Sequence, residues 1–428
     1  MSQEKVRVHV DQLQEGMYIS LSEHWMNHPF MLNNFKLKKE KQIKIIKEMG
    51  IQEVLYIPEK SDRSPLSLKN KKRTGGKQAQ DKDEKNARTK LFADKRQKIE
   101  QLKDIKDKVS KCRGKYQNTM KKMPNLMSDL FAGKKEGTEA ADLVVGEMVD
   151  TFLDESESVV HLMSAEGDEA DLAYHFINVS VLSLMIGESM DLSKQDMHCL
   201  GKGALLHDIG KLRIEKKYLR KTRESMNKHE LDLVRKHPEY GVEILQKSDP
   251  EIPTRILDIV HQHHEYLEGL GYPRGLSDKE LPLLSRIVTM ANVYDNLTNH
   301  YDPQKSLTPH QALLTIFKEY CDLLDMHVLS VMVQCLGVYP PGSIIKLSNG
   351  TLGKVMGINP ERPLKPYLFL FDPGVPKKEA AIFNLSDEPD LNIRKSIPPS
   401  ELSEETYRYL SPRLKLAYYA DTLDEGST

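Results

Sequence analysis

Histidines are distributed very unevenly along this chain, and their distribution narrows the choice of fold more than any other property of the sequence. Twelve of the 15 histidines lie between His161 and His327. Over residues 138–336, apolar side chains recur at the helical period, and almost nothing alternates as a strand does. The sequence therefore predicts a mainly helical domain over residues 138–336 that brings many imidazoles together.

Several of these histidines stand beside other residue types that bind metals. His207 is followed by Asp208 at the end of one apolar helix-like run, and His263 is followed by His264 at the end of another. His175 lies in the middle of a third run. Paired ligand types at helix ends favour a shared site over isolated core histidines.

Two more residues belong with this set. Asp171 precedes His175 by four positions and so shares its helix face. His237 stands directly before a proline. Any one of these residues alone is more often a satisfied core or surface side chain than a ligand. Together, however, imidazoles and carboxylates form a ligand set typical of Zn, Mn or Fe.

The spacing of the adjacent pairs favours two metals over one. Neighbouring residues at a helix end point about 100° apart around the helix axis. A His-Asp or His-His pair can therefore reach two ions that lie close together. Two such ions generate a nucleophile from water and neutralise phosphate charge, which suits the hydrolysis of a phosphodiester.

Four further segments flank the helical domain. Residues 1–58 combine strand-like alternation with one helix-like run, which predicts a small α+β domain. Residues 59–90 predict a basic flexible linker. Residues 91–137 predict an amphipathic helical connector that either packs on its own domain or pairs with a second copy. Residues 337–428 predict a β-rich extension and a polar tail.

Charge and composition exclude several classes of protein. The net charge of −1 conceals two oppositely charged parts. Residues 60–122 hold 22 basic and 8 acidic residues, whereas the rest of the chain holds 40 basic and 55 acidic residues. Because the basic surplus is confined to one segment, the charge argues against a nucleic-acid binder. No apolar run reaches the length of about 18 residues that a membrane span needs. The first residues lack the apolar core of a signal peptide, and the four cysteines are scattered, so we expect a cytoplasmic protein.

Two motifs resemble those of the HD-GYP domain. The first is His207-Asp208-Ile209-Gly210-Lys211, and the second runs from His263 to Pro273 and ends in Gly271-Tyr272-Pro273. HD-GYP proteins are bacterial phosphodiesterases of cyclic di-GMP within the HD phosphohydrolase superfamily. The resemblance extends from about Asp168 to Leu336 and implies an all-helical HD-type domain.

The flanking segments also resemble parts of such proteins. Residues 5–58 resemble the small domain that often precedes HD-GYP, on the evidence of Gly16-Met17-Tyr18, Trp25 and His28-Pro29-Phe30. The segment from Tyr339 onward resembles the extension that follows it.

The resemblance implies a role for individual residues. The implied metal ligands are His175, His207, Asp208, His237, His263 and His264. Asp171 falls where three-metal members carry a glutamate, so two or three divalent ions, Fe or Mn, are implied. Asp208 and Lys211 are implied to be catalytic, with Lys211 on the substrate phosphate. The loop residues Gly271, Tyr272 and Pro273 are implied to touch substrate or partner proteins.

The chain departs from the family pattern at two places. Asn292 stands where the family has a metal-binding aspartate, so the resemblance implies a neutral ligand there. Residues 299–305 lack the arginine that grips phosphate in the family, and His300 and Lys305 are candidate replacements. Glu265 either faces the metal, orients a ligand histidine, or is a surface charge at the helix end. Asp295 is expected to support a neighbouring side chain.

The predicted function is metal-dependent hydrolysis of cyclic di-GMP to the linear dinucleotide pGpG, and to GMP after a second cut, in bacterial signalling. One alternative is a catalytically weak module that binds cyclic di-GMP or signalling proteins through the Gly-Tyr-Pro loop. Another keeps hydrolysis but takes a different cyclic dinucleotide or a nucleotide monophosphate. The helix from Leu91 offers a route to a homodimer.

Overall fold

We describe a computed structural model of the 428-residue chain. It describes residues 5–21, 30, 33–67, 114–153, 158–164, 171–222, 225–300, 302, 305–359, 362–375, 377, 380, 382–388, 390–410 and 416–422. Two compact units are present. The first comprises Met1–Lys106, Leu347–Gly353 and Phe369–Phe383, and the second comprises Asp107–Lys346, Lys354–Leu368 and Asn384–Thr428.

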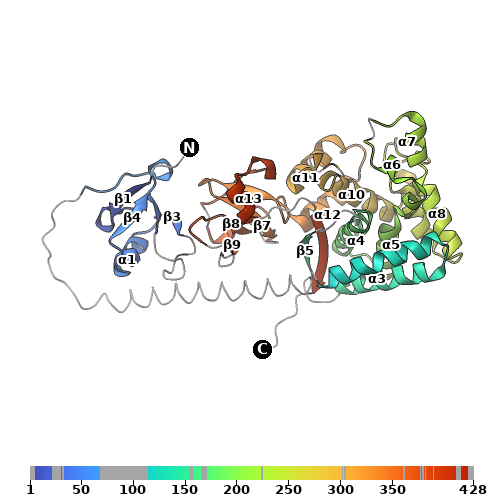
Figure 1. The fold of residues 1–428 in the computed structure, drawn as a ribbon, viewed down its shortest axis with the longest axis horizontal. Coiled ribbons are helices and arrows are strands. Elements are labelled where there is room, and N and C mark those ends of the chain that lie inside the picture. The colour runs from blue at the N-terminus through green and yellow to red at the C-terminus, as the bar shows by residue number, and fades with distance from the viewer. Residues whose placement is uncertain are drawn as a thin grey trace, which may run out of the picture. The chain divides into compact units, whose positions relative to one another are not determined.

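The N-terminal part of the first unit is a four-stranded antiparallel sheet with one helix (Figure 1). Its strands, in the order β1-β4-β2-β3, are β1 (Val6–His9), β4 (Glu53–Tyr56), β2 (Tyr18–Ser20) and β3 (Asn34–Lys36). Helix α1 (Glu40–Glu48) buries Ile43, Ile45 and Ile46 in the core of this unit. The predicted small α+β domain is confirmed.

A polar contact joins this sheet to a segment far along the chain but within the same unit. The buried carboxylate of Asp372 accepts hydrogen bonds from the backbone N–H of Asn33 at 3.1 Å and from Nδ2 of Asn34 at 2.6 Å. It also accepts the backbone N–H of Gly374 at 2.9 Å. The first unit is therefore built from residues more than 330 positions apart.

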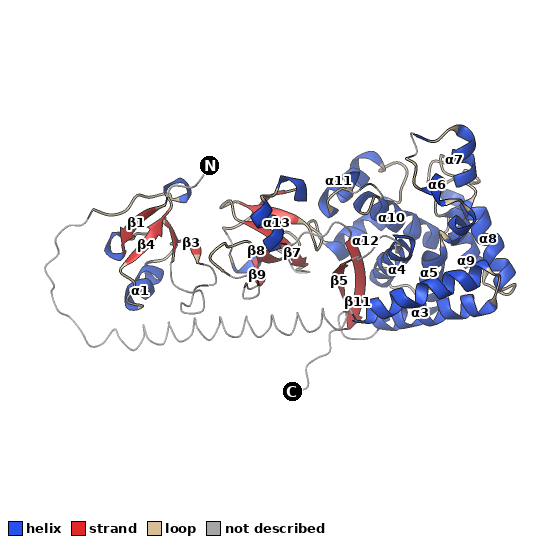
Figure 2. Cartoon of the chain, in the orientation of Figure 1, coloured by secondary structure: helices blue, strands red, loops and turns tan. Residues whose placement is uncertain are grey.

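Helices dominate the second unit, as Figure 2 shows in blue. Residues 114–131 are helical. The helices that follow are α3 (Lys135–Leu153), α4 (Asp171–Ser189), α5 (Lys194–Leu206), α6 (Lys216–Leu219), α7 (Lys228–Val234), α8 (His237–Ser248), α9 (Thr254–Gln262), α10 (Leu283–Thr298), α11 (Pro309–Glu319) and α12 (Met326–Leu336). The predicted helical domain, with its apolar runs ending at residues 206 and 262, is confirmed.

Helix α4 forms the centre of this unit. It contacts α3, α5, α10 and α12, and its middle turns are buried, with Phe176, Ile177 and Leu182 fully inside. A helix that is apolar on nearly every side has to lie in the interior of a bundle. This position places His175, on the second turn of α4, beside the ends of its neighbours.

The structure differs from the sequence prediction in one respect within this unit. Strand β5 (Ser158–Ser164) lies in a region where we expected almost no strand, and it pairs antiparallel with β11 (Leu416–Thr422). The partner strand is more than 250 residues away along the chain. A local sequence pattern therefore cannot predict the pairing. The polar tail, from which we predicted little, thus supplies one strand of this ribbon.

The C-terminal strands form a five-stranded sheet in the order β10-β6-β7-β8-β9. Its members are β6 (Ile344–Leu347), β7 (Leu352–Gly357), β8 (Tyr367–Leu370), β9 (Ile382–Asn384) and β10 (Ile393–Ser396). A short helix, α13 (Glu404–Leu410), follows. The predicted β-rich extension is confirmed.

Several predictions fall outside the described residues. They concern Trp25 and His28-Pro29, the linker from residue 68 onward and the apolar positions between Leu91 and Val109. Within the described part of the chain, no helix combines the length and the apolar character that crossing a membrane requires.

Candidate metal centre

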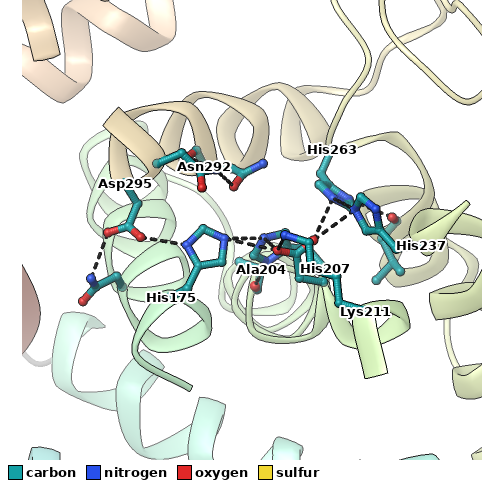
Figure 3. Close-up of polar contacts among 12 residues, drawn as sticks. His175, Ala204, His207, Lys211, His237, His263, Asn292 and Asp295 are labelled. Atoms are coloured by element: carbon teal, nitrogen blue, oxygen red, sulfur yellow. Dashed lines mark hydrogen bonds and ion pairs between the residues drawn. The ribbon is translucent and has the colours of Figure 1, made fainter. Parts of the chain in front are cut away.

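The site consists of two groups of metal-binding side chains that share one residue. The first group contains Asp208, His237, His263 and His264, and the second contains His175, His207 and Asp208. Within each group the ligand atoms all lie within 4.8 Å of one another. Figure 3 shows how the labelled histidines converge from separate helices.

Asp208 presents one carboxylate oxygen to each group. Its Oδ1 lies 3.0 Å from Nε2 of His237 and 3.4 Å from Nε2 of His263. Its Oδ2 lies 3.3 Å from Nε2 of His175 and 3.4 Å from Nε2 of His207. The carboxylate therefore stands where a ligand would bridge two ions.

Close backbone packing brings this aspartate to His237. Asp208 follows the end of α5, and the next turn packs against the start of α8. A Cβ atom on Gly210 would lie 1.9 Å from the carbonyl oxygen of His237. Since no side chain fits there, glycine is required for the two segments to approach this closely.

Three of the histidines are oriented by backbone carbonyls. In each, Nδ1 lies 2.7–2.8 Å from the carbonyl oxygen of the residue three positions earlier. The pairs are His207 with Ala204, His237 with Val234, and His263 with Val260. Since a carbonyl only accepts, Nδ1 carries the proton in this assignment, and the Nε2 lone pair faces the site.

Nε2 atoms of neighbouring rings then lie close together. Nε2 of His237 lies 3.1 Å from Nε2 of His263, and Nε2 of His175 lies 3.2 Å from Nε2 of His207. Oδ1 of Asp208 is buried and accepts no hydrogen bond from the described residues, although His237 Nε2 is 3.0 Å away. Imidazole nitrogens and carboxylate oxygens that lie this close together repel one another unless a cation lies among them. The side chains therefore fit a pair of divalent ions.

Burial keeps most of these imidazoles neutral. It lowers the pKa of His263 to about 3, outweighing the opposing effect of Asp208. Burial, together with the neighbouring histidines, also holds the pKa of His264 well below its usual range, and burial lowers the pKa of His207. Neutral imidazole is the form that binds a metal, so these rings are ready to bind without losing a proton.

His175 behaves differently because two carboxylates flank it. Burial alone would lower its pKa, but hydrogen bonds to Asp208 and Asp295 raise it to about 9. Nδ1 of His175 lies 2.7 Å from Oδ2 of Asp295. The other carboxylate oxygen, Oδ1, accepts hydrogen bonds from Nδ2 of Asn178 and of Asn299 at 2.8 Å each. Asp295 therefore fixes the orientation of His175, as we expected of a supporting residue.

Lys211 lies directly beside the bridging carboxylate. Its Nζ contacts Oδ2 of Asp208, and the lysine side chain is only 20% exposed. Burial would raise the pKa of the Asp208 carboxyl, but the positive charge of Lys211 and the hydrogen bonds from the histidines hold it well below its usual range. The carboxylate is therefore ionised, and a cation stands at the edge of the centre.

The Gly-Tyr-Pro loop lies against the first group. The ring of Tyr272 stacks on His264, with centroids 4.5 Å apart and planes 18° apart. A Cβ atom on Gly271 would lie 2.4 Å from the Cα of Glu265, so only glycine allows this close approach. The loop therefore forms one wall beside the metal-binding residues, with Pro273 next in the chain.

Glu265 has a role that we did not anticipate. Its buried carboxylate accepts the backbone N–H groups of Arg274, Gly275 and Leu276 at 2.6–3.1 Å. It is therefore neither a surface charge nor a partner of a ligand histidine among the described contacts. The proximity of a glutamate to a glycine-rich loop was the only available signal, and it does not specify which N–H groups are bound.

Two further predicted ligands, Asn292 and Asp171, stay predictions. Asn292 is buried on α10, and its Oδ1 accepts a hydrogen bond from Nδ2 of Asn296 at 2.6 Å. Asp171 is the first residue of α4, but its side chain lies outside the described part. Of the candidate replacements for the absent arginine, His300 accepts the backbone N–H of Asp302 at 3.0 Å.

Two family models match separate parts of the chain. Residues 151–328 match the model of the HD domain. The chain therefore contains an HD domain. Residues 5–141 match a domain of unknown function, DUF3391. The recognition of an HD-type helical domain preceded by a small N-terminal domain is therefore confirmed.

Curated relatives of this chain include phosphodiesterases. It is 25% identical to a cyclic di-GMP phosphodiesterase of Pseudomonas aeruginosa, over 85% of this chain and 84% of the relative. It is 31% identical to a 3′3′-cGAMP-specific phosphodiesterase of Vibrio cholerae, over 39% of this chain and 36% of the relative. Among solved structures, the HDG"Y"P protein Bd1817 of Bdellovibrio bacteriovorus is similar, with 17% identity, a TM-score of 0.41, and coverage of 77% of this chain and 98% of that one.

Proposed function

We propose that this protein is a metal-dependent phosphodiesterase that hydrolyses cyclic di-GMP to its linear dinucleotide and, after a second cut, to GMP. The observation that carries the proposal is the position of Asp208, whose two oxygens face two separate groups of histidines. A shared carboxylate between two such groups is the arrangement that paired divalent ions require. Phosphodiester hydrolysis is a reaction that paired ions promote.

The proposed ligands divide between the two groups. His237, His263 and His264 would hold one ion, His175 and His207 the other, and Asp208 both. Asn292 and Asp171 stay in the proposal as additional ligands for a third ion or for an altered metal preference. Bound ions, Fe or Mn by resemblance, supply the Lewis acidity that activates water and offsets phosphate charge.

The chain's own residues perform the remaining work. Lys211 contacts Asp208, and in this proposal it transfers that contact to a phosphate oxygen and stabilises the charge that develops during attack. Tyr272, stacked on His264, offers an aromatic face and a hydroxyl beside the first group. Gly271 and Pro273 shape the loop that would hold the nucleotide.

The relatives support cyclic di-GMP and suggest a second candidate. The cyclic di-GMP phosphodiesterase of P. aeruginosa aligns over most of both chains, which favours this substrate. The V. cholerae relative acts on 3′3′-cGAMP and is more similar over a shorter region, so 3′3′-cGAMP is the second candidate. A binding module without turnover is the less favoured alternative, because both groups keep histidine ligands around the shared Asp208.

Turnover by purified protein tests the proposal. The protein would be prepared without oxygen, loaded with Mn²⁺ or Fe²⁺, and assayed with cyclic di-GMP and 3′3′-cGAMP while metal content is measured. We expect hydrolysis of cyclic di-GMP, and we expect Asp208→Asn to reduce both activity and metal affinity by at least about 100-fold. Asp232→Asn, an exposed position on α7, is the matched control.

Metal binding without turnover would contradict the proposal. If two equivalents of metal are bound and neither dinucleotide is cut, the protein is not this enzyme. Faster turnover of 3′3′-cGAMP would replace the first substrate by the second. The homodimer, protein partners at the Gly-Tyr-Pro loop and a cytoplasmic location stay predictions.

A further inference from the structure

A second cation lies beside the Gly-Tyr-Pro loop and has no assigned role. Arg235 follows the last residue of α7 and precedes His237 by two positions. Its guanidinium carbon lies 5.3 Å from the centre of the Tyr272 ring. Since that ring stacks on His264, one aromatic ring separates the arginine from a metal-facing histidine.

No described residue accepts a hydrogen bond from the side chain of this arginine. Its Nε is buried and has no hydrogen-bond partner, and no carboxylate lies within ion-pair distance of it in the part of the chain that the structure describes. A guanidinium stays charged at any physiological pH and has five N–H donors. A buried donor without an acceptor is costly, which points to an acceptor that arrives with a ligand.

Arg213, another arginine near the centre, has the ion-pair partner that Arg235 lacks among the described residues. Arg213 also lies over a tyrosine, with its guanidinium carbon 5.6 Å from the centre of the Tyr240 ring. However, Arg213 forms an ion pair with Glu243. Lys211 likewise contacts Asp208. Arg235 differs from both because its charge has no carboxylate beside it.

We propose that Arg235 is a substrate-binding residue that grips the second phosphate of the cyclic dinucleotide, the one not being cut. This inference rests on the proposed function. A cyclic dinucleotide carries two phosphodiesters, and Lys211 with the metal groups can serve only the one that reacts. The planar fork of a guanidinium matches two oxygens of a phosphate.

The placement over Tyr272 gives this contact its geometry. A cation over the face of a tyrosine is attracted by the ring, which restrains its distance from the ring centre. The tyrosine is fixed in turn by His264 on its ring and by its backbone N–H, which donates to the His264 carbonyl at 3.2 Å. The second phosphate would therefore be held at a set distance from the metal-binding residues.

The test compares a substrate that has two phosphates with a probe that has one. Steady-state kinetics would be measured for cyclic di-GMP and for bis(p-nitrophenyl) phosphate with the wild type, Arg235→Ala, Arg235→Lys and the control Arg213→Ala. For Arg235→Ala we expect KM for cyclic di-GMP to rise about tenfold or more, with kcat nearly unchanged. Arg235→Lys should recover part of this loss, since it keeps the charge and loses the fork. Arg213→Ala should stay within about twofold of the wild type.

Two further readouts separate the possible failures. Metal content and the rate on bis(p-nitrophenyl) phosphate should not change in Arg235→Ala, and calorimetry should show the same tenfold weaker binding of cyclic di-GMP. Equal losses on both substrates, or unchanged binding of cyclic di-GMP, would overturn the role of Arg235. If the wild type cuts bis(p-nitrophenyl) phosphate but not cyclic di-GMP, the proposed function fails, while the binding measurement still decides the inference.

Discussion

At the scale of single residues, the described centre depends on carboxylates with different tasks. Asp208 faces both histidine groups, Asp295 fixes the ring of His175, and Glu265 holds the loop that carries Tyr272. The sequence predicted the first of these from its adjacency to His207. It predicted a supporting role for Asp295 but no specific partner, because the contact joins residues 120 positions apart.

Removing the charge of Asp295 should weaken the centre without dismantling it. In Asp295→Asn the amide keeps the shape of the side chain but loses the charge, so the pKa of His175 should fall from about 9. We expect Mn²⁺ affinity to fall about 10- to 100-fold, since partners of ligand histidines contribute on that order. Calorimetric titration with Mn²⁺ and a histidine-selective NMR titration check both expectations. Unchanged affinity relative to the exposed control Asp322→Asn would contradict them.

At the scale of elements, helix ends decide the position of the site. Apolar periodicity predicted α5 and α9, and it placed His207 and His263 directly after their last turns. Periodicity cannot predict how closely two such ends approach, because that depends on small residues such as Gly210. Periodicity also does not describe loops. The sequence therefore did not predict that Glu265 accepts three consecutive backbone N–H groups.

The loop should loosen when Glu265 loses its charge. Glu265→Gln keeps one acceptor oxygen and cannot satisfy the N–H groups of Arg274, Gly275 and Leu276 together. We expect about 1–3 kcal/mol of lost stability and faster amide exchange across residues 271–276. Hydrogen exchange and urea unfolding measure the two effects. Glu268→Gln, at an exposed position of the same loop, should change neither.

At the scale of the whole molecule, contacts between distant parts of the chain were the least predictable. Strand β5 pairs with β11, and Asp372 binds Asn33 and Asn34 within the first unit. The sequence of each segment alone has no pattern that predicts its conformation, because the conformation depends on the distant partner. The fold class followed from local periodicity, whereas these long-range pairings leave no periodic trace.

Loss of the Asp372 carboxylate should destabilise the first unit. In Asp372→Ala the backbone N–H of Asn33 and the side chain of Asn34 lose their acceptor. Since Asp372 is buried, we expect about 1–3 kcal/mol of lost stability and faster amide exchange at residues 33–37. Glu53→Ala, at an exposed position of β4, is the control. Equal protection of residues 33–37 in both variants would refute the expectation.

The carbonyl contacts of the three ring-oriented histidines also concern the cost of assembly. Each ring of His207, His237 and His263 bonds a carbonyl three residues earlier, and so closes the hydrogen bonding of a helix end as well as facing the centre. The rotamers of these rings are therefore chosen by the backbone during folding. A centre built in this way loses little side-chain freedom when it takes up its ions. Ion binding then needs little rearrangement of these three rings.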